Sequence, residues 1–557
     1  MIYYCLQYKH VLIMDRITPF QTEIVRECIQ RRRGCLCVPM GTGKTLIGLS
    51  IINRIGDSMP ALVVCSKTLI ESWVYEIQKF FGEKMVYAVY HKDYMPDGEF
   101  DEYTPLAGTD VVLTTPDVLM KAYNEHSIHD KFVTSTLEER GGFMPVKVNR
   151  YNIPLKPFLG LKTALKYNNA FLYNIPWKCI LVDELQQYTN IYTKKCEAIC
   201  SVFARYRWGT TGTPISEPKI ERLVGYHYII GDTSFPTCVP DANRYITSDY
   251  TGLLETMVIR YQADLDFVLP ECTEQIISHS LTREECAIYT SLKEVIKTLR
   301  NIVMKSKDKN PGIIRSINAQ FLAMILYTRQ FLVNPIGPYN SLMKKKLTNE
   351  MTESFKDEIM KRNIVNLLKE NPKSSRINAI IDVLNKHPDE RCIVFSCFRT
   401  NLDLMKKIVP DETGGRKVFT IKSQYTSQER VELVKRFEST SNGILFLTYE
   451  LGAEGLNLQR SRIMLLADVW WNDSKTSQAV ARVLRRGQTQ KVFVYLFTSN
   501  TGIEKSLYAK HIDKKEAIGF LMVGRMRGKI RKITMTDLIE LILKEEENIN
   551  MLADARR

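Results

Sequence analysis

The sequence predicts an α/β protein with two parallel-sheet lobes and a helical region between them. Apolar runs of four to six residues recur, each followed by a polar turn and a helix-period stretch, which is typical of a parallel sheet wrapped by helices. The runs form two sets, one before about residue 215 and one after about residue 375, with charge-rich helical sequence between them. The 557 residues suffice for two or three domains of ordinary size.

Each set contains five expected strands. The first set comprises residues 35–38, 61–65, 110–114, 179–182 and 207–210. The second set comprises residues 392–396, 418–421, 443–448, 463–467 and 492–497. We therefore expect an N-terminal lobe over 1–215, a helical insertion region over 216–375, a C-terminal lobe over 376–515 and a tail over 516–557. An insertion at about 120–176 interrupts the first lobe, and the tail carries a basic cluster at 525–532 and an amphipathic helix at 536–547.

Charge and cysteine usage narrow the class of protein. The chain carries 77 Lys plus Arg against 62 Asp plus Glu, a formal net charge of +15, and this excess favours nucleic acid over an acidic membrane surface as a partner. The 13 cysteines are scattered through apolar runs, which indicates buried thiols in a reducing compartment. Neither a membrane-spanning run nor a secretory signal is recognisable. We expect a soluble intracellular protein without a membrane partner; nucleus, cytoplasm and virion are equally open.

A glycine-containing loop follows the first expected strand. The run Gly41-Thr42-Gly43-Lys44-Thr45 stands between that strand and a helix-forming segment. Backbone N–H groups of such a loop point at phosphate oxygens, and the helix N-terminus adds partial positive charge. Lys44 in this pattern reaches the β- and γ-phosphates, and Thr45 ligates magnesium. Val38 stands where the full pattern has a further glycine, which leaves a chance turn as the alternative.

Two adjacent carboxylates follow the expected strand at 179–182. Asp183 and Glu184 fall at the carboxyl end of a buried strand, where parallel α/β sheets bind ligands. Asp183 suits magnesium held through its water shell, and Glu184 suits activation of the attacking water. A solvated turn is the alternative. A third run, Thr210-Thr211-Gly212-Thr213-Pro214, closes the next strand with hydroxyls suited to sensing the γ-phosphate.

The second lobe supplies candidate arginine fingers. On one continuous helix Gln478, Arg482 and Arg485 lie at i, i+4 and i+7 and share a face. Turned toward Lys44 and Asp183, such a face would place planar, always-charged groups against the charge that develops on the γ-phosphate. A basic helix face in contact with solvent is the alternative.

Taken in order, these motifs resemble those of the Swi/Snf-type helicase-like ATPases of superfamily 2. The resemblance runs from about residue 17 to 515. Ile17-Thr18-Pro19-Phe20-Gln21 is similar to the adenine-recognising glutamine motif, and the ending Arg486-Gly487-Gln488 is the most specific piece. The expected form, without an appended module, resembles the compact versions encoded by bacteria, phages and large DNA viruses.

The resemblance implies two RecA-like lobes and an ATP- and Mg²⁺-dependent motor that moves along double-stranded DNA. The catalytic residues would be Lys44, Asp183, Glu184, Arg482 and Arg485. Nucleotide binding would fall on Gln21, Gly41, Thr42, Gly43, Lys44, Thr45, Gly455 and Gln478, and the metal on Thr45 and Asp183. Contacts to the nucleic-acid backbone, which position a strand without reading its sequence, would fall on Ser66, Thr114, Thr115, Ser396, Thr448 and Trp471. Core packing is the alternative for Trp471.

Three positions depart from the family pattern. Gln186 stands where histidine is usual, Ala453 replaces a glycine, and Pro39-Met40 precede the phosphate loop where acidic residues are favoured. The alternatives are a strand-separating DNA or RNA helicase, a transcription-associated nucleoside triphosphatase, and a nucleic-acid-binding assembly factor whose ATPase has decayed. Transcription or chromatin machinery are further candidate partners, and the oligomeric state is open.

Overall fold

The structure is a computed structural model. It describes residues 17–38, 41–55, 59–94, 108–127, 147–148, 154–155, 170–173, 175, 177–212, 220–231, 258–259, 269–305, 323–338, 373–422, 424–452, 456, 458–468, 473–485, 487–501 and 504. The chain forms two compact units that divide between Val268 and Leu269. This division falls inside the region 216–375 that we expected to be a helical insertion.

The first unit contains a seven-stranded parallel sheet. Its strand order is β3 (Tyr87–Tyr90), β4 (Val111–Thr114), β2 (Ala61–Val64), β7 (Trp177–Asp183), β8 (Ala204–Thr211), β1 (Arg33–Cys37) and β9 (Val258–Ile259). Every residue of β2, β4 and β7 is buried, as expected of parallel strands covered on both faces. The strands β3 and β9 were not predicted, and β9 shows that this sheet continues beyond residue 215.

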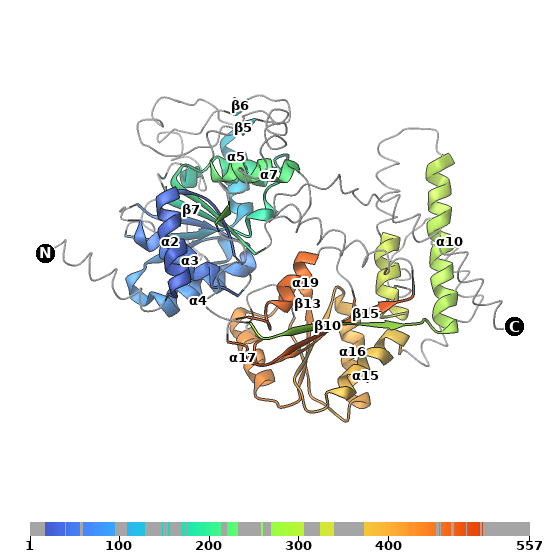
Figure 1. The fold of residues 1–557 in the computed structure, drawn as a ribbon. Helices are drawn as coiled ribbons and strands as arrows, with labels where there is room; N and C mark the ends of the chain where they lie inside the picture. The colour runs from blue at the N-terminus through green and yellow to red at the C-terminus, as the bar shows by residue number, and fades with distance from the viewer. Residues whose placement is uncertain are drawn as a thin grey trace. The chain divides into compact units, whose positions relative to one another are not determined.

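Helices cover both faces of the first sheet (Figure 1). One face carries α2 (Pro19–Arg31), α3 (Lys44–Arg54) and α4 (Ile70–Phe80), and the other carries α5 (Pro116–Ser127), α6 (Lys194–Cys200) and α7 (Ile220–Ile230). Neighbouring residues of β1 alternate between the two cores, with Cys35 and Cys37 in one and Leu36 in the other. The short strands β5 (Lys147–Val148) and β6 (Pro154–Leu155) pair antiparallel within the expected insertion at 120–176.

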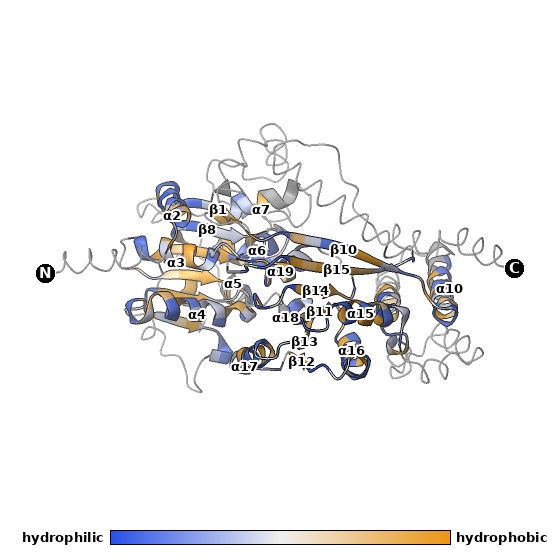
Figure 2. Ribbon diagram, turned by 60° about the horizontal axis from the view of Figure 1, so that its bottom comes forward, coloured by the Kyte–Doolittle hydropathy of each residue, from blue (hydrophilic) through white to orange (hydrophobic). Residues whose placement is uncertain are grey.

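The second unit contains a six-stranded parallel sheet. Its order is β10 (Cys272–His279), β15 (Val492–Ser499), β14 (Ile463–Leu466), β11 (Cys392–Ser396), β13 (Ile444–Thr448) and β12 (Val418–Thr420). One face carries α15 (Ser375–Lys386) and α16 (Arg399–Glu412), and the other carries α17 (Ser427–Glu438), α18 (Tyr449–Gly452) and α19 (Asp473–Val480). Figure 2 shows β14 and β15 as hydrophobic, whereas the edge strand β10 is mixed. The long helix α10 (Arg283–Lys305) follows β10.

The predicted α/β class with two parallel-sheet lobes is thus confirmed. All ten expected strands are present, with bounds shifted by a few residues. The region 216–375, which we expected to be a helical insertion, also contains β9 and β10, which lie as edge strands of the two sheets. None of the helices in the described ranges is both long enough and apolar enough to cross a membrane.

A buried arginine ties helix ends to the sheet in each lobe. The guanidinium of Arg207, fully buried, donates to the carbonyls of Ile229 at 2.8 Å and Ile199 at 3.1 Å, which lie in the last turns of α7 and α6. Arg416 donates to the carbonyl of Leu384 in the last turn of α15 and to that of Asn442 in the turn before β13, each at 2.9 Å. Helix C-termini carry partial negative charge and favour such cations. Burial lowers the pKa of Arg207 to about 10, so the side chain stays charged at neutral pH.

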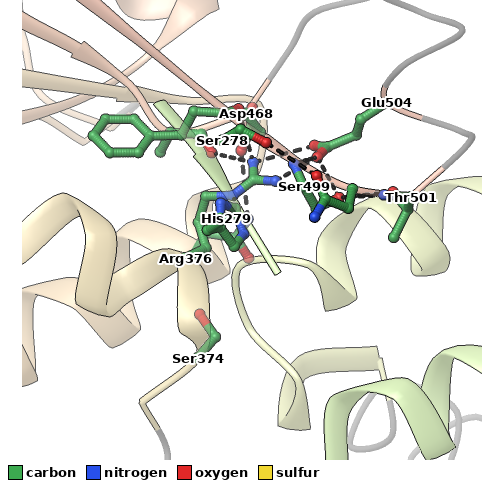
Figure 3. Close-up of polar contacts among 12 residues, drawn as sticks. Ser278, His279, Ser374, Arg376, Asp468, Ser499, Thr501 and Glu504 are labelled. Carbon is green, nitrogen blue, oxygen red and sulfur yellow. Dashed lines mark hydrogen bonds and ion pairs between the residues drawn. The ribbon is translucent and has the colours of Figure 1, made fainter. Parts of the chain in front are cut away.

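A buried arginine and its ion pair join four elements of the second lobe (Figure 3). Arg376, at the start of α15, is fully buried and forms a salt bridge with Glu504. Its Nη1 also donates to the carbonyls of Ala467 at 2.8 Å and Phe497 at 3.1 Å, where β14 and β15 end. Its Nε donates to Nε2 of His279 at 3.1 Å, at the end of β10. This arginine therefore fixes one edge of the second sheet.

The His279 imidazole should make the second lobe acid-sensitive. Nε2 accepts a hydrogen bond from a cation, so the ring must be neutral; burial and then Arg376 lower its pKa to about 3, against an opposing contribution from Glu504. An unfolded histidine takes up its proton near pH 6.5, so this contribution to stability is complete above about pH 6.5 and falls as the pH drops toward 3. We expect the Tm of the wild-type protein to fall more steeply between pH 7 and 5 than that of His279→Gln. Parallel Tm profiles in a pH series of thermal melts would contradict this.

Candidate active site

The register of the first sheet aligns the candidate residues at one edge. Asp183 pairs with Thr210 across β7 and β8, and Cys37 pairs with Thr211 across β1 and β8. Val64, two residues before Ser66, pairs with Val182. Because these strands are parallel, their carboxyl ends lie at the same edge, which is where such sheets bind ligands.

The loop before α3 has the shape of a phosphate cradle. Gly41 and Gly43 adopt φ values of 84° and 82°, in the left-handed region that glycine enters at low cost. Gly43 is the N-cap of α3 and offers no side chain to its N–H groups. Lys44 and Thr45 begin the helix. Such a turn into a helix N-terminus binds anions, so these residues fit the phosphates of ATP.

Gln21 connects α2 to this loop. Its Oε1 accepts from the backbone N–H of Thr18 at 3.0 Å, and the Thr18 hydroxyl accepts from the N–H of Gln21 at 3.2 Å, a capping box. Its Nε2 donates to the carbonyl of Thr42 at 2.9 Å. A Cβ on Gly43 would lie 2.7 Å from the same Nε2, so glycine permits this contact. The expected adenine contact would use these amide atoms and stays a prediction.

Three donors orient the carboxylate of Asp183, which is largely buried. The Thr210 hydroxyl donates to Oδ1 at 2.7 Å, and the N–H of Glu184 donates to the same oxygen at 3.0 Å. The indole N–H of Trp73 donates to Oδ2 at 3.0 Å. The carboxylate is therefore fixed at the sheet edge, as a group that holds magnesium through water would require.

Glu184 occupies an unusual backbone conformation. Its φ of 50° and ψ of 48° are left-handed, which costs a residue with a Cβ roughly 1–2 kcal/mol. Such strain concentrates at functional sites. Gln186 donates from Nε2 to the Glu184 carboxylate. The amide at the position where the family has histidine therefore contacts the expected general base directly.

Two glycines allow β8 and α7 to pack closely against the segment that follows Glu184. A Cβ on Gly209 of β8 would lie 2.2 Å from Cδ2 of Leu185, and a Cβ on Gly225 of α7 would lie 1.9 Å from the carbonyl oxygen of Thr189. Real Cβ atoms do not approach this closely. The segment that follows Glu184 is therefore packed between β8 and α7 without room for a further side chain.

The prediction that Gln478, Arg482 and Arg485 lie on one helix is wrong. Helix α19 ends at Val480, and turns follow in which the N–H of Arg482 donates three residues back at 3.1 Å. Gln478, Arg482 and Arg485 therefore do not share one helix face. The cause is tertiary: Nε of Arg482 donates to the carbonyl of Gly452 at 3.1 Å, and the Arg482 carbonyl accepts from a neighbouring loop at 3.2 Å. These bonds replace helical ones.

Two predicted nucleic-acid contacts have buried hydroxyls. Thr114 is fully buried, and its Oγ1 donates to the carbonyl of Tyr90 at 3.0 Å. Ser396 is fully buried and donates to the carboxylate of Asp468. Neither hydroxyl reaches the surface in this structure, because each is engaged inside its own lobe.

The other predicted contacts differ in position. Ser66 is half-buried, and its Oγ lies 3.0 Å from that of Thr68. Thr115 is buried and accepts from the N–H of Val118 at 3.3 Å, at the start of α5. Thr448 is half-buried and accepts from a backbone N–H at 3.4 Å. Outside the described residues lie Trp471, Gly455, Ala453, Arg486, Pro39-Met40, the basic cluster at 525–532 and the tail helix at 536–547.

Sequence reasoning missed the roles of Trp73 and Asp468. Asp468 accepts from Ser396, from the N–H of Cys397 at 2.7 Å and from Asn401 at 3.5 Å. Trp73 lies 110 residues from its partner Asp183. Spacing along the chain gives no signal for either contact.

The fold and this site define the class of two-lobed, helicase-like ATPases. The SNF2-related domain family matches residues 20–336, and the helicase conserved C-terminal domain matches residues 375–487. The chain belongs to the SNF2-related family. It is accordingly a nucleic-acid-dependent ATPase of helicase superfamily 2.

Similar proteins come from viruses and cellular organisms. The chain is 26% identical to the protein named helicase 172L of Invertebrate iridescent virus 6, over 90% of this chain and 86% of that protein. It is 21% identical to the DNA repair and recombination protein RAD54-like of Gallus gallus, over 97% of this chain and 72% of that protein. It spans about half of JBP2 of Trypanosoma brucei brucei, at 23% identity over 98% of this chain and 49% of that protein. A solved SWI2/SNF2 ATPase core of Sulfolobus solfataricus in complex with double-stranded DNA is 20% identical with a TM-score of 0.33, covering 95% of this chain and 96% of that chain.

Proposed function

We propose that the protein is a translocase on double-stranded DNA that hydrolyses ATP with Mg²⁺. The observation that carries the proposal is the alignment, at one sheet edge, of the glycine loop at 41–45 with the Asp183 carboxylate, which Thr210 holds at 2.7 Å. A phosphate cradle beside an oriented carboxylate is the arrangement that nucleoside triphosphate hydrolysis needs.

The residues of the first lobe would divide the work as follows. The loop N–H groups and Lys44 would bind the β- and γ-phosphates, and Gln21 would contact adenine. Thr45 and Asp183 would hold Mg²⁺, which neutralises charge between those phosphates. Glu184 would take the proton of the attacking water.

The second lobe would complete the site. Gly455 and Gln478 would contact the nucleotide, and Arg482 and Arg485 would stabilise charge on the γ-phosphate. The turns that follow α19 fix Arg482 through the carbonyl of Gly452 at 3.1 Å. Its guanidinium is therefore positioned by the last residue of α18 and not by neighbours on one helix face.

Nucleic acid would lie along the hydroxyl-bearing strand ends. Ser66 and Thr448, which are half-buried, would contact backbone phosphates together with Trp471, and Thr115 would do so once its buried side chain is exposed. Thr114 and Ser396 would do so only after leaving Tyr90 and Asp468. The formal net charge of +15 supports a polyanionic partner.

The name of one relative supports DNA as the partner, and a sequence motif supports its duplex form. The RAD54-like protein is named for DNA repair and recombination, and the ending Arg486-Gly487-Gln488 is absent from generic superfamily 2 helicases. A transcription-associated nucleoside triphosphatase is the second candidate, because the chain is 22% identical over 66% of its length to transcription termination factor 2 of Drosophila melanogaster.

ATP hydrolysis with duplex DNA, single-stranded DNA and RNA tests the proposal. We expect duplex DNA to stimulate most, without release of a strand from forked or blunt substrates. Lys44→Ala should lower the stimulated rate by roughly 100- to 1,000-fold, the usual loss when one preorganised donor to a developing charge is removed. Lys84→Ala is the control, since Lys84 is exposed on η2 (Gly82–Lys84). Strongest stimulation by RNA, or robust strand separation, would overturn the duplex translocase.

A further inference from the structure

We infer that Trp73 is a positioning residue that fixes Asp183 for Mg²⁺ and connects that carboxylate to the segment at 66–69. The inference deepens the proposed function and rests on it, because it takes Asp183 as the magnesium-holding group. Trp73 itself touches neither nucleotide nor metal in this scheme; it acts through the carboxylate.

The contact between the two side chains is direct and sheltered from water. Trp73 is 1% exposed, and its indole N–H donates to Oδ2 of Asp183 at 3.0 Å. A hydrogen bond to an ionised carboxylate is stronger than one between neutral groups. Burial of both partners keeps solvent from replacing it.

The indole itself is held in place by close packing. A Cβ on Gly48 of α3 would lie 3.3 Å from Cη2 of Trp73 and 2.7 Å from Cδ1 of Leu181 on β7. The ring therefore sits against the helix that leaves the phosphate loop, in the core cluster that it shares with Leu181. An indole confined in this way presents its N–H in one direction.

Trp73 completes the orientation of the carboxylate. The side-chain torsion that turns an aspartate carboxyl group is broad and weakly restrained. Thr210 and the N–H of Glu184 both donate to Oδ1, and Trp73 donates to Oδ2. The plane of the carboxylate is thus set from two sides, by β8 and by α4.

Helix α4 also leads back to a candidate nucleic-acid contact. It begins at Ile70, directly after η1 (Lys67–Leu69) and Ser66. Ser66 follows β2, whose end is level with that of β7. A strand that binds at 66–69 would therefore shift the first turn of the helix that carries Trp73, and the indole would transmit that shift to Asp183.

Trp73→Phe in the full chain tests the inference, because it keeps an aromatic ring and removes the N–H. The first readout is binding of a fluorescent ATP analogue titrated with Mg²⁺. We expect roughly 10-fold more Mg²⁺ for half-saturation, the usual effect of removing a partner of a metal-holding group, with unchanged affinity in EDTA. The second readout is the ratio of DNA-stimulated to basal hydrolysis, which should fall.

The chain offers a matched control in Trp177→Phe. Trp177 is also 1% exposed and donates from its indole N–H to the carbonyl of Leu172 at 2.8 Å. Its replacement removes a buried indole hydrogen bond, here to a backbone carbonyl, from the same lobe without touching Asp183. Mg²⁺ dependence should stay at the wild-type value in this variant, although its Tm falls.

The outcomes separate the inference from the proposed function. Wild-type Mg²⁺ dependence in Trp73→Phe, or an equal shift in Trp177→Phe, overturns the positioning role, and an unchanged stimulation ratio overturns the connection to 66–69. A wild-type protein that DNA does not stimulate overturns the proposed function, whereas the Mg²⁺ titration still decides the role of Trp73. If Trp73→Phe does not fold, benzothienylalanine at position 73 replaces only the N–H by sulfur and gives the same comparison.

Discussion

Glutamine in place of Glu184 is expected to lower the DNA-stimulated kcat by roughly 100- to 10,000-fold, the range that a general base contributes. The reason is that the amide keeps the size of the side chain but cannot take a proton from water. The hydrogen bond that Gln186 donates to residue 184 can persist to the new amide oxygen, so the loop should keep its shape. Phosphate release measures the rate, and binding of a fluorescent ATP analogue should remain as in the wild type.

Glu197→Gln is the control for this experiment. Glu197 lies on α6 of the same lobe and pairs with Lys194 at 3.0 Å near the surface, so its loss should leave hydrolysis unchanged. If Glu184→Gln hydrolyses ATP about as fast as the control, another group accepts the proton and the assignment of Glu184 fails.

Methionine in place of Arg376 is expected to lower the free energy of unfolding by about 3–5 kcal/mol, because removing one partner of a buried ion pair leaves the other charge uncompensated. Glu504 would remain buried, and the carbonyls of Ala467 and Phe497 would lose their donor. Urea denaturation followed by far-UV circular dichroism measures the change. Glu504→Gln should also destabilise, since it removes the charge that Arg376 faces.

A second ion pair in the same lobe serves as the control. Arg462 and Glu390 form a salt bridge with side chains that are each 32% exposed, and partly exposed pairs contribute about 0–1 kcal/mol. Arg462→Met should therefore shift the urea midpoint far less than Arg376→Met. Equal shifts of the urea midpoint in the two variants would show that Arg376 does not stabilise the sheet edge more than an ordinary surface ion pair does.

The sequence predicts the central strands well and the edge strands poorly. β2, β7 and β11 are buried along their whole length, so an unbroken apolar run is a requirement of their place in a parallel sheet. β10 pairs only with β15 in the described sheet and is half exposed; its sequence therefore mixes polar and apolar residues. β9 spans two residues, too few for any pattern.

In the candidate site too, the sequence predicts the local motifs but not the contacts between distant segments. The phosphate loop and Asp183-Glu184 are local motifs, and the structure places both at one sheet edge. The bond between Trp73 and Asp183 and the end of α19 at Val480 depend on segments far apart in the chain. Local pattern carries no information on such partners, because tertiary contacts override helix propensity.

Helix α7 packs against the segment that follows Glu184, the residue expected to activate water. Arg33 donates to the carbonyl of Gly231 at 2.7 Å and Arg207 to that of Ile229 at 2.8 Å. These hydrogen bonds hold the end of the helix in place. Gly225 leaves no gap between the helix and the carbonyl of Thr189. A side chain at position 225 therefore fits only if the segment from Glu184 to Thr189 moves, because hydrogen bonds hold the end of α7. A side chain at position 225 would displace Glu184, although every ATPase motif in the sequence would be unchanged. A variant of this chain can therefore be inactive while all of its ATPase motifs are present.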